Sequence, residues 1–356
     1  MMEFIRHQLA LHPSILPQDA LKMSFQAAYG AEHLLQNIDK AREYFMSEFN
    51  MCGMQNSHNV MELIAPEICR VNLAEWKRLT LPPEWLFNLF ALSAGSVQEN
   101  ADECFFEHVN KWLEFVQDPM NEQSLTFSME CFEQTLAKYY DNCGIDASVS
   151  CMQATGKPQP LHHSPEYKQA ERPAYRVISG AYVRLVPVLM EIGRLGKTSG
   201  VIAIDGRAAS GKTTLADGLR YVLGAEVIRM DDFFLPVELR TTARFSEVGG
   251  NIHYERFAQE VLPLLRNVSK GFEYRVFDCK TMDFAGTRSI KPSNWRVVEG
   301  TYSHHPYFGD YMDYRIFSDI DEQTQLKRII ARNGNEMAKM FAEKWIPLEE
   351  RYFAKR

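Results

Sequence analysis

The residues with the clearest chemical meaning form one short run, Gly206-Arg207-Ala208-Ala209-Ser210-Gly211-Lys212-Thr213, with the pattern G-x-x-x-x-G-K-[ST]. In this Walker A pattern, backbone N–H groups surround phosphate oxygens, the lysine reaches the terminal phosphates and the hydroxyl residue holds Mg²⁺. The pattern needs a strand before it and a helix after it. Val201–Ile204 is an apolar run typical of a strand, and the residues from Thr214 to Leu219 fit the first turns of a helix. The sequence therefore predicts a site for ATP and Mg²⁺ made by Gly206, Ala208, Ala209, Ser210, Gly211, Lys212, Thr213 and Thr214.

Two acidic residues follow predicted strands and complete the chemistry of such a site. Asp231 follows the apolar run 225–230, and Glu299 ends the apolar run that starts at Trp295. Because parallel strands end at one edge of a sheet, we expect both acids beside the glycine-rich loop. Asp231 can take the proton of an acceptor hydroxyl, and Thr213, Asp231 and Glu299 are candidate Mg²⁺ ligands. The alternatives are that Asp231 only caps a turn and that Glu299 is a solvated strand end.

A pair of arginines supplies the positive charge that phosphoryl transfer requires. Arg328 and Arg332 are four residues apart, so they lie on one face of a predicted helix and could reach phosphates from a closing lid. Arginine pairs are also common on protein surfaces, so the pair has meaning only beside the other motifs. Together these patterns predict phosphoryl transfer, with Lys212, Asp231, Arg328 and Arg332 as the catalytic residues.

The elements that must position these residues alternate between strands and helices after about residue 200. Strands are predicted over Val201–Asp205, Ala225–Met230, Tyr274–Phe277, Trp295–Glu299 and Tyr314–Ile320. Helices are expected after the loop, over 255–266 and over 322–332. Such alternation predicts an α/β domain with a doubly wound parallel sheet over residues 200–356, which binds its ligands at the carboxyl ends of the strands.

The first 195 residues have a different pattern and predict a mainly α-helical domain. Pro17 opens a helical segment that Gly30 ends, with apolar residues on one face. Another helical stripe runs from Phe105 to Val116. The stretch from Gly196 to Gly200 is the predicted hinge between the two domains. The sequence assigns no function to this first domain.

The length, charge and cysteine content of the chain argue against several classes of protein. The 356 residues are too many for one ordinary core, and the net charge of −7 gives no support to nucleic-acid or membrane binding. The N-terminus lacks a basic segment followed by an apolar run, and seven scattered cysteines without C-x-x-C spacing predict reduced thiols. We therefore expect a cytoplasmic protein without nucleic-acid or membrane partners, and the phosphoryl-transfer motifs predict a small-molecule acceptor as its partner. The oligomeric state stays open.

In their order along the chain, these motifs resemble the uridine kinase and phosphoribulokinase group of P-loop kinases. The matching segments are Ile204–Thr214, Asp231-Asp232-Phe233-Phe234 for that group's D-x-F-Y, Val298-Glu299-Gly300, and Ile316–Asp319 with Leu326–Asn333. The resemblance covers about residues 200 to 356. It implies that Asp231 is the catalytic base, that Lys212 and Thr213 serve ATP and Mg²⁺, and that Arg328 and Arg332 belong to a lid.

The chain departs from that group where the group recognises its nucleoside. Asn251-Ile252-His253-Tyr254-Glu255 stands where a uridine kinase has Asn-Phe-Asp-His-Pro, so His253 replaces the aspartate that grips the ribose. Met282 replaces the histidine that reads the base. Without the aspartate and the histidine, the ribose hydroxyls and the base of uridine would lose their hydrogen-bond partners. This loss argues against uridine as the substrate. The candidate acceptor residues are therefore His253, Tyr254, Met282 and, after the Glu299 strand, His304.

Two further interpretations stay open at this point. The chain could be a nucleotide-dependent regulator, in which ATP changes the contacts of the first domain and no small molecule is phosphorylated. A basic and aromatic cluster, made of Tyr167, Arg172, Tyr175 and Arg176, could contact a phosphate or a partner, although a role at a domain interface is favoured.

Overall fold

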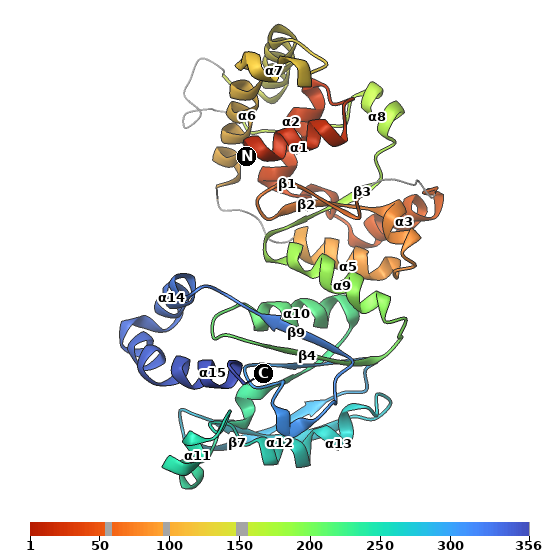
Figure 1. Cartoon of the computed structure of the whole chain (residues 1–356). Coiled ribbons are helices and arrows are strands. Elements are labelled where there is room, and N and C mark those ends of the chain that lie inside the picture. The colour runs from red at the N-terminus through yellow and green to blue at the C-terminus, as the bar shows by residue number, and fades with distance from the viewer. Residues whose placement is uncertain (54–58, 95–99, 147–155, 356) are drawn as a thin grey trace. The chain divides into compact units, whose positions relative to one another are not determined.

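A computed structural model of the chain describes residues 1–53, 59–94, 100–146 and 156–355, so Cys151 lies outside the described residues (Figure 1). The chain divides into two compact units, Met1–Gly193 and Arg194–Arg356, and the predicted hinge lies just after this division. Among the described helices, none is long and apolar enough to cross a membrane.

The N-terminal unit combines helices with a small antiparallel sheet. Its helices are α1 (Met2–Leu11), α2 (Pro17–Tyr29), α3 (Ile38–Met51), α4 (Leu73–Arg78), α5 (Pro83–Ala94), α6 (Ala101–Gln117), α7 (Met129–Cys143), α8 (Pro165–Glu171) and α9 (Leu185–Arg194). Its strands, in the order β1-β2-β3, are β1 (Met61–Ala65), β2 (Ile68–Asn72) and β3 (Tyr175–Ser179).

The two helical patterns noted in this half are confirmed, but the expectation of a mainly helical domain missed the sheet. Helix α2 ends before Gly30, whose φ of +59° is left-handed and suits a helix stop. Helix α6 buries Phe105, Val109 and Trp112. Strand β2 gives no alternating pattern because four of its five residues are buried, among them the charged Arg70. Its partner β3 lies far along the chain, so no local signal marks the pair.

The C-terminal unit is built on a parallel sheet of four strands in the order β5-β8-β4-β9. These strands are β4 (Gly200–Gly206), β5 (Glu226–Arg229), β8 (Trp295–Glu299) and β9 (Tyr314–Ser318), and they confirm four predicted strands. The fifth predicted strand is present, but it does not belong to the parallel sheet. Tyr274–Phe277 lies in β6 (Phe272–Asp278), which pairs only with β7 (Asp283–Ile290) in an antiparallel hairpin. Strand β7 is largely exposed and contains Gly286, so its sequence lacks an apolar strand pattern.

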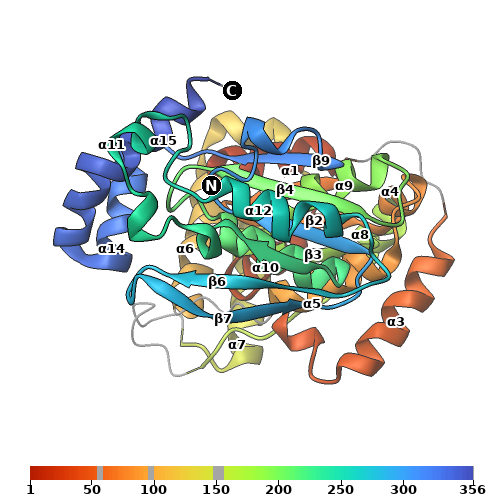
Figure 2. The same ribbon diagram turned by 90° about the horizontal axis from the view of Figure 1, so that it is seen from below.

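Helices cover both faces of the parallel sheet. The helices of this unit are α10 (Lys212–Leu223), α11 (Thr242–Ser246), α12 (Tyr254–Glu260), α13 (Leu262–Leu265), α14 (Glu322–Met340) and α15 (Ile346–Phe353), and a π-helical turn, Phe341–Trp345, joins the last two. Helix α10 packs against β4, β5 and β8. Figure 1 shows α12 and α13 on the opposite side of the sheet, and Figure 2 shows β6 and β7 as a paired ribbon next to α12.

The core of this unit explains why the sheet forms. Side chains alternate across a strand, so each central strand supplies apolar residues to both faces. On the face toward α12 and α13, a core cluster contains Ala203, Ile228 and Val298, and each is fully buried. Burying one valine or isoleucine side chain stabilises the fold by roughly 1.5–3 kcal/mol. The packed sheet therefore provides a rigid edge on which loops can hold reactive groups.

Candidate nucleotide and phosphoryl-transfer site

The predicted phosphate-binding loop joins β4 to α10 and has a backbone that its glycines permit. Gly206 has a φ of +140°, and a Cβ atom there would meet the Ser318 carbonyl oxygen at 2.0 Å. Gly211 has a φ of +95° directly before the first residue of α10. Both positions favour glycine, because L side chains rarely adopt these conformations. The strand, loop and helix order that the motif requires is therefore present.

Lys212 starts α10 and turns its side chain back over the loop. Its Nζ atom donates to the Gly206 carbonyl oxygen at 2.9 Å and to the Arg207 carbonyl oxygen at 2.7 Å. Burial lowers the pKa of this ammonium group, while the nearby carboxylates Glu349 and Glu299 raise it. The lysine is thus held in the concave side of the loop, where a bound phosphate would meet it.

Thr213 and Glu299 form the pair expected of a magnesium site. The Thr213 hydroxyl donates to Glu299 Oε1 at 3.0 Å. Their meeting follows from the sheet, since β8 lies beside β4 with Glu299 opposite Ile204. Burial raises the pKa of Glu299, the charge of Asp231 raises it further, and the Thr213 hydrogen bond opposes both. A hydroxyl and a carboxylate are oxygen ligands of the kind that Mg²⁺ prefers.

Asp231 lies at the same edge, two residues after the end of β5, whose last residue pairs with Glu299. Its side chain is accessible to solvent, yet protein atoms surround it closely enough to remove part of its hydration. This desolvation raises the pKa of Asp231, Lys212 opposes the shift and Asp232 adds to it. The Asp231 carboxylate is therefore accessible and lies within the electrostatic field of Lys212.

Asp232, the next residue, has a structural setting that sequence reasoning missed. It is buried and accepts hydrogen bonds from the Tyr274 hydroxyl at 2.8 Å and from Arg288 Nε at 2.8 Å. Arg288 Nη2 also donates to it at 3.2 Å. Both partners belong to the β6–β7 hairpin, so Asp232 fixes the hairpin beside Asp231. No sequence motif predicts these hydrogen bonds, because Tyr274 and Arg288 lie in strands far from Asp232 along the chain.

The two predicted lid arginines lie on α14, near the glycine-rich loop and Asp231. Arg328 Nη1 donates to the Ala209 carbonyl oxygen at 3.3 Å. The positive charge of Arg332 lowers the pKa of Asp231, although its Nε donates to its neighbour Asn333. Helix α14 breaks at Gly334, which has a φ of +80°. The structure therefore brings both arginines to the site without showing a closed lid.

A second unexpected contact comes from α15. The Ala208 N–H in the loop donates to Glu349 Oε2 at 3.1 Å, and the Ala208 carbonyl oxygen accepts from Gln325 Nε2 at 3.2 Å. Glu349 is buried, and this burial raises its pKa to about 7. The sequence offered no signal for Glu349, since it lies in the last helix of the chain and in no motif.

The candidate acceptor residues divide between two places. His253 caps α12, where its Nδ1 accepts from the Arg256 N–H and lies 3.2 Å from Glu255 Oε2. The Tyr254 hydroxyl donates to Glu247 at 2.7 Å and accepts from Arg244. These two residues form a network of their own, and no described hydrogen bond links them to Asp231.

Met282 and His304 have different surroundings. Met282 lies in the turn of the β6–β7 hairpin with a left-handed φ of +58°. Cys279 in the same turn is close enough to Asp231 for their charges to interact, so this turn borders the predicted acceptor site. His304 is turned inward, and its Nε2 contacts the Ala203 carbonyl oxygen at 3.1 Å. A substrate contact by His304 would require its ring to leave β4.

Comparisons with known proteins agree with the motifs. A curated relative, uridine kinase-like protein 3 of Arabidopsis thaliana, is 29% identical over 154 residues, which cover 40% of this chain and 32% of the relative. Part of the chain resembles uridine kinases. The chain spans about a third of the length of that relative. No family model matches the chain.

A solved structure described as a possible uridine kinase from Bacillus stearothermophilus also matches. It shares 21% identity with a TM-score of 0.31, and the match covers 40% of this chain and 84% of that one. The predicted resemblance to uridine kinases is confirmed over part of the chain by the curated relative.

Proposed function

We propose that the chain is an ATP-dependent kinase that transfers the γ-phosphate of ATP to a hydroxyl group of a small molecule. One observation carries the proposal: Lys212, Thr213, Glu299 and Asp231 lie together at the carboxyl edge of one parallel sheet. Phosphoryl transfer needs little more than positioned phosphates, a metal and a proton acceptor. The resemblance to uridine kinase-like proteins supports the same reaction class.

The residues present fit ATP and Mg²⁺. The loop between Gly206 and Lys212 precedes a helix N-terminus, where phosphate oxygens bind well, and its buried Ser210 hydroxyl has no hydrogen-bond partner among the described residues. Thr213 and Glu299 would hold the metal, and Lys212 would bind the terminal phosphates. When bound, the nucleotide and its metal supply an activated phosphoryl group.

Asp231 then acts as the base. Its carboxylate is accessible, and its raised pKa lies closer to neutral pH than that of an ordinary aspartate, which favours proton transfer from an alcohol. Arg332 adds positive charge beside Asp231, and Arg328 reaches the loop from the same helix. These positions orient an acceptor hydroxyl between the base and the phosphate-binding loop.

We infer further that the acceptor differs from uridine. At the position of the ribose-gripping aspartate, His253 is occupied with capping α12 and lies against Glu255. At the position of the base-reading histidine, Met282 brings an apolar side chain to the hairpin turn. A small alcohol, sugar or vitamin precursor places fewer demands on these two positions than a nucleoside does.

The replacement Lys212→Ala tests the function. We expect ATP turnover with a metabolite pool to fall by at least about a hundredfold, because the terminal phosphates lose their cation. Arg220→Ala is the matched control, since Arg220 is exposed on the same helix and its side chain has no described partner. Circular dichroism checks that both variants fold. Equal turnover in Lys212→Ala and Arg220→Ala would refute the assignment.

A further inference from the structure

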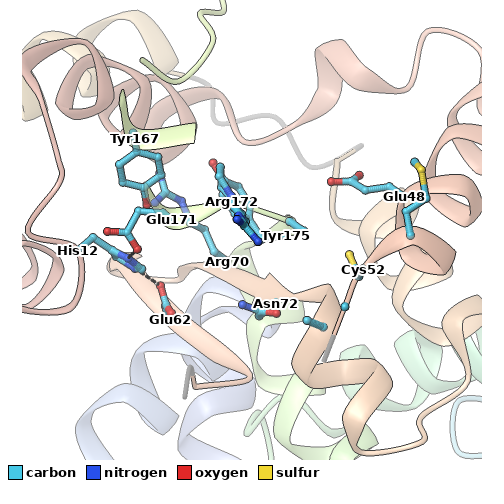
Figure 3. A pocket seen from close by; sticks show the side chains of 15 residues that line it. His12, Glu48, Cys52, Glu62, Arg70, Asn72, Tyr167, Glu171, Arg172 and Tyr175 are labelled. Atoms are coloured by element: carbon cyan, nitrogen blue, oxygen red, sulfur yellow. Dashed lines mark hydrogen bonds and ion pairs between the residues drawn. The ribbon is translucent and has the colours of Figure 1, made fainter. Parts of the chain in front are cut away.

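The N-terminal unit contains a cavity of about 460 Å³, which lies within the size range of small-molecule sites. Its walls come from several elements, among them β2, β3 and the end of α8 (Figure 3). Three members of the basic and aromatic cluster seen in the sequence line it, namely Tyr167, Arg172 and Tyr175. The fourth, Arg176, does not line it and pairs with Glu48 at 2.8 Å.

The acidic residues of the cavity already have partners. His12 contacts Glu62 at 2.9 Å and Glu171 at 3.0 Å, and Figure 3 shows this group at one side of the cavity. Burial lowers the pKa of His12, but its hydrogen bonds to the two glutamates outweigh this effect and raise the pKa overall. The remaining acid, Glu48, pairs with Arg176.

Arg70 on β2 is a buried cation whose described hydrogen bonds go to a neutral amide, while the charges of Glu62 and Asp19 lie close enough to stabilise it. Its side chain is almost fully buried, and its Nε and Nη2 both donate to the neutral Gln26 Oε1, at 3.1 and 2.7 Å. The guanidinium group lies 4.7 Å from the centre of the Tyr175 ring. Its Nη1 makes no hydrogen bond to any residue within the described ranges. Arg70 lines the cavity, so an anion bound there would meet a buried positive charge.

Arg172 brings a second guanidinium group to the cavity. It follows α8 in a left-handed conformation with a φ of +45°, which few residues other than glycine adopt. In the described part of the chain, its side chain takes part in no hydrogen bond and no ion pair. Figure 3 places Arg172, Arg70 and Tyr175 between the His12 group and Glu48. Two guanidinium groups in one cavity present planar pairs of donors that fit carboxylate and phosphate oxygens.

We propose that this cavity binds a small molecule through a carboxylate or phosphate group, held by Arg70 Nη1 and the Arg172 guanidinium beside the Tyr175 ring. The site is separate from the phosphate-binding loop and uses none of its residues. It gives the N-terminal unit, to which the sequence assigned no function, a ligand-binding role of its own.

Isothermal titration calorimetry of the full chain tests the site. Inorganic phosphate and succinate are titrated separately at fixed ionic strength, so that the two arms distinguish phosphate from carboxylate recognition. All proteins carry Lys212→Ala, which removes the main phosphate contact of the loop. We expect saturable binding of at least one anion, weakened at least about tenfold by the further change Arg172→Ala.

The matched control is Arg184→Ala, which removes the same charge from an exposed residue of the same unit that does not line the cavity. We expect this variant to bind the anion as its parent does. The proposal fails if neither anion binds, or if Arg172→Ala and Arg184→Ala weaken binding equally.

Discussion

At the scale of single residues, the two neighbouring aspartates of the site have opposite roles. Asp231 is accessible, and its raised pKa reflects lost hydration in the presence of Lys212. Asp232 is buried and receives three hydrogen bonds from Tyr274 and Arg288. The first is therefore suited to accept a proton, and the second to hold the β6–β7 hairpin in place.

The variant Asp231→Asn tests the role of the base. We expect kcat for acceptor phosphorylation to fall by about 10²–10⁴-fold, because an amide cannot accept the proton. ATP affinity and thermal stability should stay close to those of the unchanged chain. Steady-state kinetics with saturating ATP measure the effect, and a kcat within threefold of the original would exclude Asp231 as the base.

Asp232→Asn provides the contrasting change. An amide leaves the Arg288 guanidinium without its charged partner, so we expect a loss of about 1–3 kcal/mol in the free energy of unfolding. Urea unfolding followed by tryptophan fluorescence measures this loss. If Asp232→Asn leaves stability unchanged, the hairpin anchor described here does not contribute to the fold.

At the scale of elements, α15 binds the phosphate-binding loop through a buried carboxyl group. Glu349 accepts a hydrogen bond from the Ala208 N–H, and burial raises its pKa from 4.5 to about 7. Because the folded pKa exceeds the usual value, the folded state binds the proton more tightly than the unfolded state. This contribution to stability is full below about pH 4.5 and is lost as the pH rises through about 7.

The variant Glu349→Gln isolates this titration. The amide cannot titrate, but its oxygen still accepts the hydrogen bond from the Ala208 N–H. We expect the parent to lose up to about 3 kcal/mol more stability than the variant between pH 5 and pH 8. Thermal unfolding at several pH values measures the difference. Glu336→Gln, at an exposed position of α14, is the control. Parallel pH profiles for Glu349→Gln and its parent would contradict the role of α15.

These elements also show which parts of the fold and of the candidate site the sequence could predict. The loop from Gly206 to Thr213 and the strands before Asp231 and Glu299 were predictable, since their signals lie within a few consecutive residues. The anchors of the site were not. Glu349 and Arg288 meet the site only through the fold, and strand β2, which buries the charged Arg70, pairs with the distant strand β3. Such contacts depend on tertiary packing, which no local pattern encodes.

At the scale of the whole molecule, the chain consists of two compact units, each with its own candidate ligand site. A ligand stabilises the unit that binds it by mass action, about 2.7 kcal/mol at a hundredfold excess over Kd. We therefore expect ATP with Mg²⁺ to raise the melting temperature of a calorimetric transition by roughly 5–10 °C. The change Lys212→Ala should abolish this shift. A shift of equal size in that variant would show that the nucleotide binds elsewhere.

The most direct test of the central claim follows the γ-phosphate itself. ATP labelled at the γ-position is incubated with the purified chain, Mg²⁺ and pooled small metabolites that carry hydroxyl groups, with uridine and cytidine in separate reactions. We predict a new labelled phosphomonoester from the pool, formed by the unchanged chain and Arg220→Ala but not by Lys212→Ala. Label found only in inorganic phosphate, whatever pool is supplied, would contradict the kinase and favour a nucleotide-dependent regulator.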